Sequence, residues 1–206
     1  MKTLARPASR VRKGSGQDQK ALLGLAGLTA LAFMFWGATE TKGSSVGRTE
    51  VFPVDQNSLR HVQGLAYDYL ATESNHPEVR ALAMMILGRN GLNINSSPES
   101  KARALHRYVA DVMPFVDDPQ GFERMVSPAE LSHRVLNNPE GTVGGDCDDE
   151  SVLLAALARS VGIPATVIFY DTNMDGEIDH VLTSFILNGK PVYGETTVRG
   201  APFGWS

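Results

Sequence analysis

The chain has 206 residues and one cysteine, with a hydrophobic fraction of 42%, a charged fraction of 20% and a formal net charge of −4. These values are ordinary for a folded protein and exclude a disordered chain, and a single cysteine excludes an intrachain disulfide. The charge is uneven: residues 1–20 carry six cations and one anion, a net charge of +5, so residues 21–206 carry −9. An acidic body of this kind is a poor partner for nucleic acid, and we expect none.

An uncharged run extends from Ala21 to Thr39 and follows the basic segment 1–20. As a helix it would be roughly 28 Å long, close to the thickness of a bilayer core, and Trp36 near its end suits the interface. We therefore predict a basic cytoplasmic tail over 1–20 and a single transmembrane anchor over 21–39, with the following domain outside the cytoplasm. A cleaved signal peptide is the alternative. A buried core helix would rarely have a basic flank and no polar face.

Residues 40–55 are rich in Gly, Ser, Thr and charged residues, and we expect them to be a linker. A helical region is predicted over 56–96, with one helix beginning near Ser58 and a second beginning at Pro77 and ending at Asn90. Serine–proline pairs at 97–98 and 127–128 predict two further helix starts. We expect these helices, and the histidines in or beside them, to be scaffold.

Cys147 lies in the run GGDCDDE, which precedes the apolar segment SVLLAALARSVG. Asp146 is a suitable N-cap, so the sequence predicts a helix with Cys147 in its first turn. The helix dipole there favours a thiolate, whereas the acids at 148–150 oppose it. A buried structural cysteine is the alternative, but a cysteine between aspartates after two glycines is unusual for a core. Cys147 is therefore a candidate nucleophile.

Two further candidates follow the cysteine helix. Residues 163–170 read as a strand, His180 begins the strand HVLTSFILNG, and Asn188-Gly189 predicts a hairpin turn into a third strand over 190–198 that holds Glu195. A thiol nucleophile needs a base and a group that orients the base. A hairpin can place His180 and Glu195 side by side, with the packed helix bringing Cys147 against them.

The loop before His180 matches part of a calcium-binding loop. Asp171, Asn173, Asp175 and Asp179 stand at ligand positions, but Leu182 occupies the position that normally supplies a bidentate carboxylate. A plain β-turn on Asp175 and Gly176 is the alternative. The sequence thus predicts no required cofactor and leaves Ca2+ open as an ion that would brace the loop.

The segments GGDCDDESVLLAALARSVGIPA and VYGETTVRGAPFGW, with His180 between them, resemble the transglutaminase-like (papain-like cysteine protease) superfamily. Its short bacterial and prophage-type members are the most similar. The likeness covers about residues 100–205, half the chain, and we predict a transglutaminase-like thiol domain over 97–206. The resemblance implies an α+β fold, a cysteine-bearing helix packed on an antiparallel β-sheet. It also implies a triad of Cys147 as nucleophile, His180 as base and Glu195 as orienting acid, where the family usually has Asp.

This resemblance implies a thiol hydrolase, a peptidase or amidase that acts on a peptide or protein through a thioester acyl-enzyme. Transfer of the acyl group to an amine, as in a transglutaminase, is the related outcome. A phage or prophage origin, a virion-associated membrane and contact with virion or envelope proteins follow from the similar members. The competing class is a structural or interaction module that keeps this fold without catalysis.

Overall fold

The computed structural model describes residues 46–138 and 143–205, and the predicted cytoplasmic tail and transmembrane anchor lie outside them. Within the described part, no helix is both long and apolar enough to cross a membrane. The elements are β1 (Thr49–Pro53), α2 (Ser58–Thr72), α3 (Pro77–Arg89), α4 (Pro98–Val112), β2 (Phe122–Val126), α5 (Pro128–Asn137), α6 (Cys147–Ser160), β3 (Ala165–Tyr170), β4 (His180–Leu187) and β5 (Lys190–Gly194).

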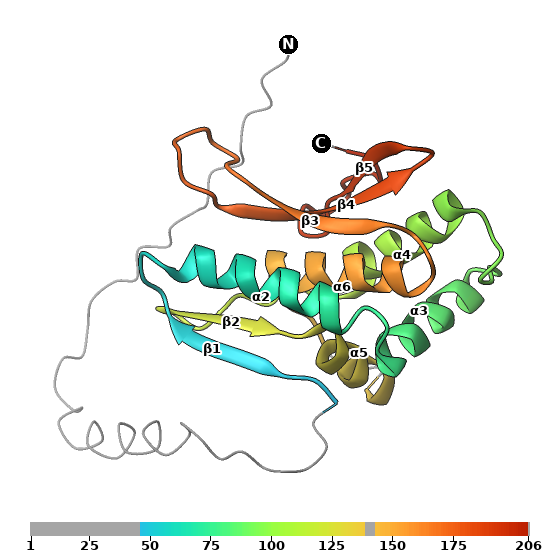
Figure 1. The fold of residues 1–206 in the computed structure, drawn as a ribbon, viewed down its shortest axis with the longest axis horizontal. Helices are drawn as coiled ribbons and strands as arrows, with labels where there is room; N and C mark the ends of the chain where they lie inside the picture. The colour runs from blue at the N-terminus through green and yellow to red at the C-terminus, as the bar shows by residue number, and fades with distance from the viewer. Residues whose placement is uncertain (1–45, 139–142, 206) are drawn as a thin grey trace, which may run out of the picture. The chain divides into compact units, whose positions relative to one another are not determined.

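Helix α6 is the centre of the fold (Figure 1). All its residues from Asp148 to Ala158 are buried, and it contacts the other four helices and strands β2, β3 and β4. A helix that is buried on every side needs apolar residues all round, which the segment VLLAALA supplies. The three acids at its start are the exception, because they are buried as well.

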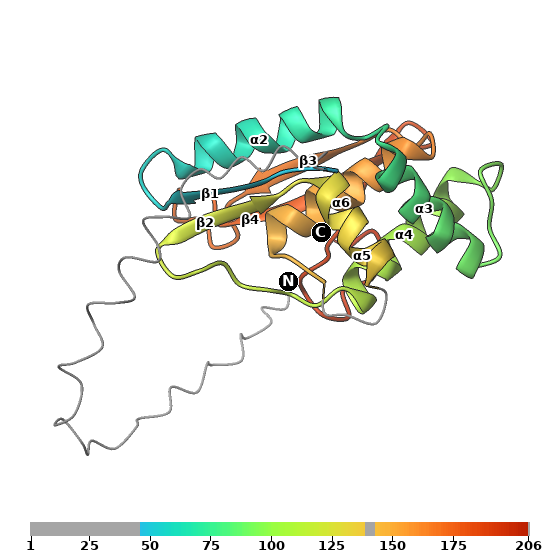
Figure 2. The ribbon, with the colours of Figure 1, turned by 90° about the horizontal axis from the view of Figure 1, so that it is seen from below.

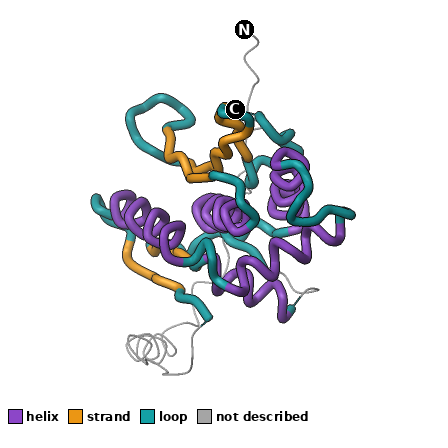
Figure 3. Tube along the Cα trace, turned by 45° about the vertical axis from the view of Figure 1, so that its right-hand side comes forward, coloured by secondary structure: helices purple, strands orange, loops and turns teal. Residues whose placement is uncertain are grey.

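Two antiparallel sheets accompany the helices. Strands β3, β4 and β5 form one sheet in that order, and β1 pairs with β2 in the other. The two sheets lie on different sides of α6 in Figure 1, with β3, β4 and β5 above the helix and β1 and β2 below it, so they overlap in the view from below (Figure 2). A tube drawing shows the strands as two separate groups with helical segments between them (Figure 3). This is an α+β fold with the cysteine helix on an antiparallel sheet, as the sequence predicted.

Helix starts agree well with the sequence. Ser97 and Ser127 cap α4 and α5 through their hydroxyl oxygens, each with proline in the first turn. These hydroxyls satisfy backbone N–H groups that have no partner inside the helix. The cap-then-proline pattern therefore located both helices.

Two predictions need correction. Residues 49–53, inside the expected linker 40–55, form β1 and pair with β2, a pairing that the sequence did not predict. In TEVFP, exposed and partly buried positions alternate, as they do in a strand. The segment is too short and too charged for this alternation to be recognised from the sequence. The third strand of the main sheet also ends at Gly194, so Glu195 directly follows β5 instead of lying within it.

Candidate active site

Two hydrogen bonds fix the first turns of α6 against the start of β4. The Ser151 hydroxyl donates to the carbonyl oxygen of Val181 over 3.0 Å, and the Thr183 hydroxyl donates to the carbonyl oxygen of Ser151 over 2.9 Å. Ser151 and Thr183 are both fully buried, where such bonds are strong and costly to break. Cys147, one turn before Ser151, is thereby held beside the strand that begins with His180.

His180 and Glu195 are in direct contact. The imidazole Nε2 lies 2.7 Å from Glu195 Oε2, and the Glu195 side chain is almost completely buried. The other oxygen, Oε1, accepts hydrogen bonds from the backbone N–H of Thr197 (2.8 Å), the Thr197 hydroxyl (2.9 Å) and the N–H of Val198 (3.2 Å). The carboxylate is thus held from both sides, which fixes the imidazole that it bonds.

Burial would by itself raise the pKa of Glu195, but the hydrogen bonds from His180 and Thr197 outweigh it and lower the pKa to about 2 from the ordinary 4.5. A carboxyl with a depressed pKa stabilises the fold fully above the unfolded value. That contribution is lost as the pH falls from about 4.5 toward 2. Glu195 is therefore an anion at neutral pH, as an orienting acid must be.

His106 on α4 contacts the backbone of Glu195. Its Nε2 lies 2.7 Å from the carbonyl oxygen of Glu195. Burial lowers the pKa of His106, so the ring is neutral and its Nε2–H donates to that carbonyl. This agrees with the expectation that the histidines of the helices are scaffold.

Cys147 and His180 line the same groove. Its volume is about 220 Å³, and its walls combine apolar side chains with carboxylates. Because Nε2 of His180 bonds Glu195, Nδ1 is the ring nitrogen that remains for the thiol. The lining residues are Leu59, Val62, Glu123, Asp146, Cys147, Asp148, Phe169, Ile178, Asp179, His180 and Val181.

Burial, followed by the carboxylates of Asp148 and Asp146, raises the pKa of Cys147. The N-terminal position on α6 does not overcome these effects. With only the charges of this chain around it, the side chain of Cys147 is therefore a protonated thiol. Nucleophilic attack by Cys147 would therefore require a base that removes its proton.

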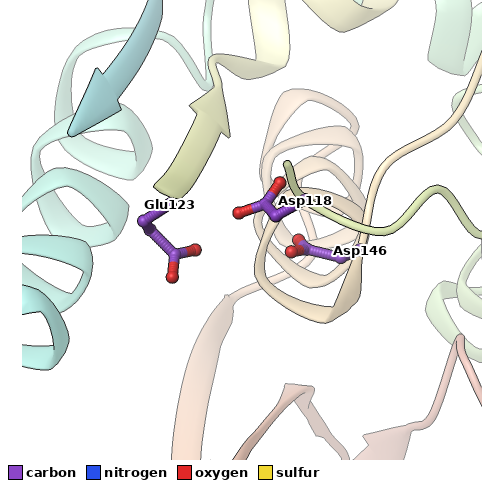
Figure 4. Close-up of side chains that lie close together, drawn as sticks. All are labelled: Asp118, Glu123 and Asp146. Atoms are coloured by element: carbon purple, nitrogen blue, oxygen red, sulfur yellow. The ribbon is translucent and has the colours of Figure 1, made fainter. Parts of the chain in front are cut away.

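An unexpected group of acids lies beside the groove. Asp118, Glu123 and Asp146 come from a loop, from β2 and from the residue before α6, and Figure 4 shows their carboxylates directed toward one another. Each offers an oxygen within 4.8 Å of the others, and Asp146, Asp148 and Asp149 form a second such group. Burial, together with the nearby Asp118 and Asp146, raises the pKa of Glu123 to about 7.

Asp146 occupies the predicted N-cap position of α6, but its side chain makes no capping hydrogen bond. The carboxylate turns to the other acids instead. Asp118 and Glu123 were not predicted as site residues, because nothing in their spacing shows that a loop and a strand will meet the start of α6. The acids at 148–150 were visible in the sequence, but their burial was not.

The predicted calcium loop is exposed, and its acids serve as turn formers. Asp171 Oδ1 accepts hydrogen bonds from three successive backbone N–H groups, and Oδ2 accepts one from Gly176. Asn173 and Asp175 each accept from the N–H two residues ahead, and Asp179 accepts twice from Thr172. These contacts are those of Asx turns. Calcium binding by this loop stays a prediction.

The profile of the transglutaminase-like superfamily matches residues 89–197, more than half of the chain and including all three triad candidates. The chain therefore belongs to the transglutaminase-like superfamily. A comparison with curated proteins gives no match.

Two solved structures are similar in backbone. One is described as a "putative protease" from Parabacteroides distasonis, with 15% identity, a TM-score of 0.45 and coverage of 66% of this chain and 26% of that chain. The other is described as a "putative cysteine protease" from Cytophaga hutchinsonii, with 16% identity, a TM-score of 0.43 and coverage of 73% and 49%. This chain spans about a quarter of the first and about half of the second.

Proposed function

We propose that this chain is a thiol hydrolase, a peptidase or amidase, that acts through Cys147, His180 and Glu195. The observation that carries the proposal is the shared groove of Cys147 and His180, combined with the 2.7 Å bond from His180 to the buried Glu195. A nucleophile, a base and an orienting acid are the parts that acyl transfer requires. Membership of the superfamily supports the same chemistry.

In the proposed reaction, His180 Nδ1 takes the thiol proton as Cys147 Sγ attacks the substrate carbonyl. The oxyanion lies at the start of α6, where the N–H of Cys147 can donate to it. The C–N bond then breaks, the leaving amine takes the proton from His180, and a thioester remains. Water next attacks the thioester and loses a proton to His180. The C–S bond then breaks, the Cys147 thiolate takes that proton from His180, and the acid and the free thiol result.

The proposed substrate is a peptide or protein, and the size of the groove is consistent with it. The groove volume of about 220 Å³ is below the roughly 300–1,000 Å³ that is usual for sites enclosing a small molecule. An open groove of this size suits one or two side chains of a peptide or protein.

Hydrolysis and amine transfer can be separated by product analysis. We expect the full chain, incubated with a peptide library and a primary alkylamine, to yield mainly products that have gained water, with a minor fraction that carries the amine. Mass spectrometry measures both. A dominant amine adduct would make the chain a transglutaminase instead. The absence of both products would support the alternative, a non-catalytic module. The raised pKa of Cys147 would agree with that alternative.

The membrane anchor is also part of this proposal. Cells expressing the full chain should hold it in the membrane fraction, whereas a variant that begins at Ser44 should be recovered in the soluble fraction, because it lacks the uncharged run 21–39. Immunoblots of the two fractions provide the measurement. A full chain that is soluble without having been shortened would contradict the anchor. A shortened, soluble chain would instead indicate a cleaved signal peptide.

The phage or prophage origin, and with it the virion or envelope partners, stays a prediction from the resemblance.

A further inference from the structure

A second hollow lies between the end of α4 and the residues that follow β5. Its volume is about 350 Å³, within the roughly 300–1,000 Å³ that is usual for sites that bind small molecules. It reaches helix α6 at Glu150, about one turn after Cys147. Of the residues that the structure describes, none lines both this hollow and the groove of Cys147 and His180. The hollow is therefore separate from the proposed reaction site.

Two polar side chains that line the hollow are buried and incompletely bonded. Glu150 is 1% exposed and Thr196 is 4% exposed. Among the described residues, Glu150 Oε1 and Thr196 Oγ1 have no hydrogen-bond partner of good geometry, although the two side chains are neighbours. Buried oxygens of this kind are costly, and natural proteins usually bond them to the chain, to water or to a ligand. The hollow thus presents oxygens that a ligand with N–H donors would satisfy.

The charges around Glu150 favour a cationic ligand. Burial raises the pKa of Glu150 to about 8, even though the Thr196 hydroxyl acts to lower it. Three neighbouring carboxylates add to the effect of burial: Asp146, Asp149 and Glu195. A positive charge placed beside Glu150 would relieve the repulsion from these carboxylates.

Two exposed charges also line the hollow, Asp111 and Arg199. Asp111 is paired with Arg107 on the same helix, with 3.6 Å between Oδ2 and Nε, so its charge is partly neutralised. Arg199 would favour an anionic ligand. Water and salt screen an exposed charge, whereas a buried charge acts through a medium of low dielectric constant. The buried Glu150 therefore outweighs Arg199 in the choice of ligand.

From these contacts we propose that the hollow binds the ammonium group of a primary alkylamine, such as a lysine side chain. An ammonium has three N–H donors and no acceptor. The hollow offers three groups that accept: the Glu150 carboxylate, the Thr196 hydroxyl and the Thr197 hydroxyl. The Thr197 hydroxyl donates its hydrogen to Glu195 Oε1, so its oxygen remains free to accept. Hydrogen bonds from an ammonium to a carboxylate are among the stronger ones in proteins.

The wall next to these oxygens suits an alkyl stem. Met113, Pro114 and Phe115 directly follow α4 and line the hollow with apolar surface, and Phe115 is 51% exposed. The methylene groups of a lysine side chain commonly lie along apolar surface while the ammonium stays with polar groups. Each methylene that is removed from water on this wall adds to the affinity.

The binding proposal does not rest on the proposed hydrolysis, and its test needs no substrate. Because Glu150 is about one turn from Cys147, a polypeptide whose lysine occupies the hollow would be held close to the candidate nucleophile. The competing description is a hollow that is filled by water, with Glu150 bonded to that water.

The test is an NMR titration of the labelled full chain with n-butylamine, whose ammonium and butyl chain match a lysine side chain. The backbone amide signals of Glu150, Thr196 and Thr197 should shift and saturate, with a Kd on the order of millimolar for so small a ligand. Methylamine should bind more weakly, by up to about fourfold for each buried methylene that it lacks. Butyrate, which carries the opposite charge, should leave these signals in place.

Glu150→Gln keeps the shape of the side chain and removes its charge, so it should weaken n-butylamine binding at least about tenfold. The matched control is Glu123→Gln, because Glu123 is an acid that lines the groove instead of the hollow. Glu123→Gln should retain the native affinity. Thr196→Val, which removes one acceptor, is a second variant of the hollow and should weaken binding severalfold. Melting curves show that each variant is folded.

Four results would overturn the proposal. Binding that is lost in Glu123→Gln and kept in Glu150→Gln would assign the amine to the groove. Equal affinities in these two variants would show that neither carboxylate selects the ligand. Saturable shifts with butyrate at similar concentrations would make Arg199 the recognising group. The absence of saturable shifts in the native chain would leave the hollow to water.

Discussion

Replacement of Cys147 by serine should abolish turnover, with a loss of kcat of about 10⁴-fold or more. A serine hydroxyl is a much poorer nucleophile than a thiol beside a base that serves to deprotonate a thiol. His180→Ala should be nearly as damaging, because the thiol proton then has no acceptor at Nδ1. The measurement is hydrolysis of the best peptide found in the library, with melting curves to show that each variant is folded.

Effects within such a unit do not add. The double variant Cys147→Ser with His180→Ala should be about as inactive as either single variant. Alkylation by iodoacetamide gives an independent readout on variants that retain Cys147. Since burial and neighbouring carboxylates raise the pKa of Cys147, alkylation should be slow at neutral pH and accelerate as the solution becomes alkaline. A His180→Ala profile identical to that of the native chain would show that the two residues are uncoupled, and the domain would then be a binding module.

The surroundings of Glu195 change the expectation for its variants. Sequence reasoning alone suggests that Glu195→Asp, which restores the family's usual residue, would be mild. The structure shows both oxygens engaged, one by His180 and the other by Thr197 and Val198. A side chain shorter by one methylene cannot reach both sides, so we expect Glu195→Asp to lower kcat substantially. Glu195→Gln keeps the length but loses the charge that stabilises an imidazolium, and should cause an intermediate loss.

The sequence predicted the helix starts and the order of the main strands because these depend on local chemistry. Ser97 and Ser127 cap their helices through contacts within three or four residues of the chain. The Asn188-Gly189 pair adopts positive φ at both residues, as a tight hairpin turn requires. Local signals of this kind are readable without knowledge of the fold.

What the sequence did not predict depends on contacts between distant segments. Strands β1 and β2 are separated by 68 residues of chain between Pro53 and Phe122, and each is too short and too charged to be recognised alone. The meeting of Asp118 and Glu123 with Asp146 depends on that pairing, because β2 carries Glu123 to the start of α6. The meeting of these three acids is thus a consequence of tertiary structure, which local patterns do not encode.

The role of the Gly144-Gly145 pair also depends on contacts with distant segments, so the sequence alone did not reveal it. Glycines just before a nucleophile invite the interpretation that a substrate backbone approaches there. The structure shows that the chain itself approaches: a Cβ on Gly144 would lie 1.7 Å from the carbonyl oxygen of Pro114, and one on Gly145 would lie 2.3 Å from the Cβ of Asp149. Gly145 also bridges to Phe115, and its carbonyl oxygen accepts from the N–H of Val116 over 2.9 Å. The glycines therefore set the position of the chain that enters α6.

Gly144→Ala should consequently be among the most damaging substitutions outside the triad. A contact of 1.7 Å with a backbone oxygen cannot be relieved by side-chain rotation, so the segment must move, at a cost of about 1–3 kcal/mol or more. Displacement of Cys147 by even about 1 Å would lower kcat on the order of a hundredfold. Chemical denaturation and peptide hydrolysis measure the two effects.

Gly64→Ala is the matched control, because Gly64 lies within α2 and a Cβ added there would meet no atom within 4 Å. Alanine there should stabilise the helix by about 0.5–1 kcal/mol and leave turnover unchanged. If Gly144→Ala behaves like Gly64→Ala in both assays, the close packing against Pro114 does not position the nucleophile. If Gly144→Ala loses turnover while its stability is unchanged, approach of the substrate backbone, and not packing of the chain, is what requires the glycine.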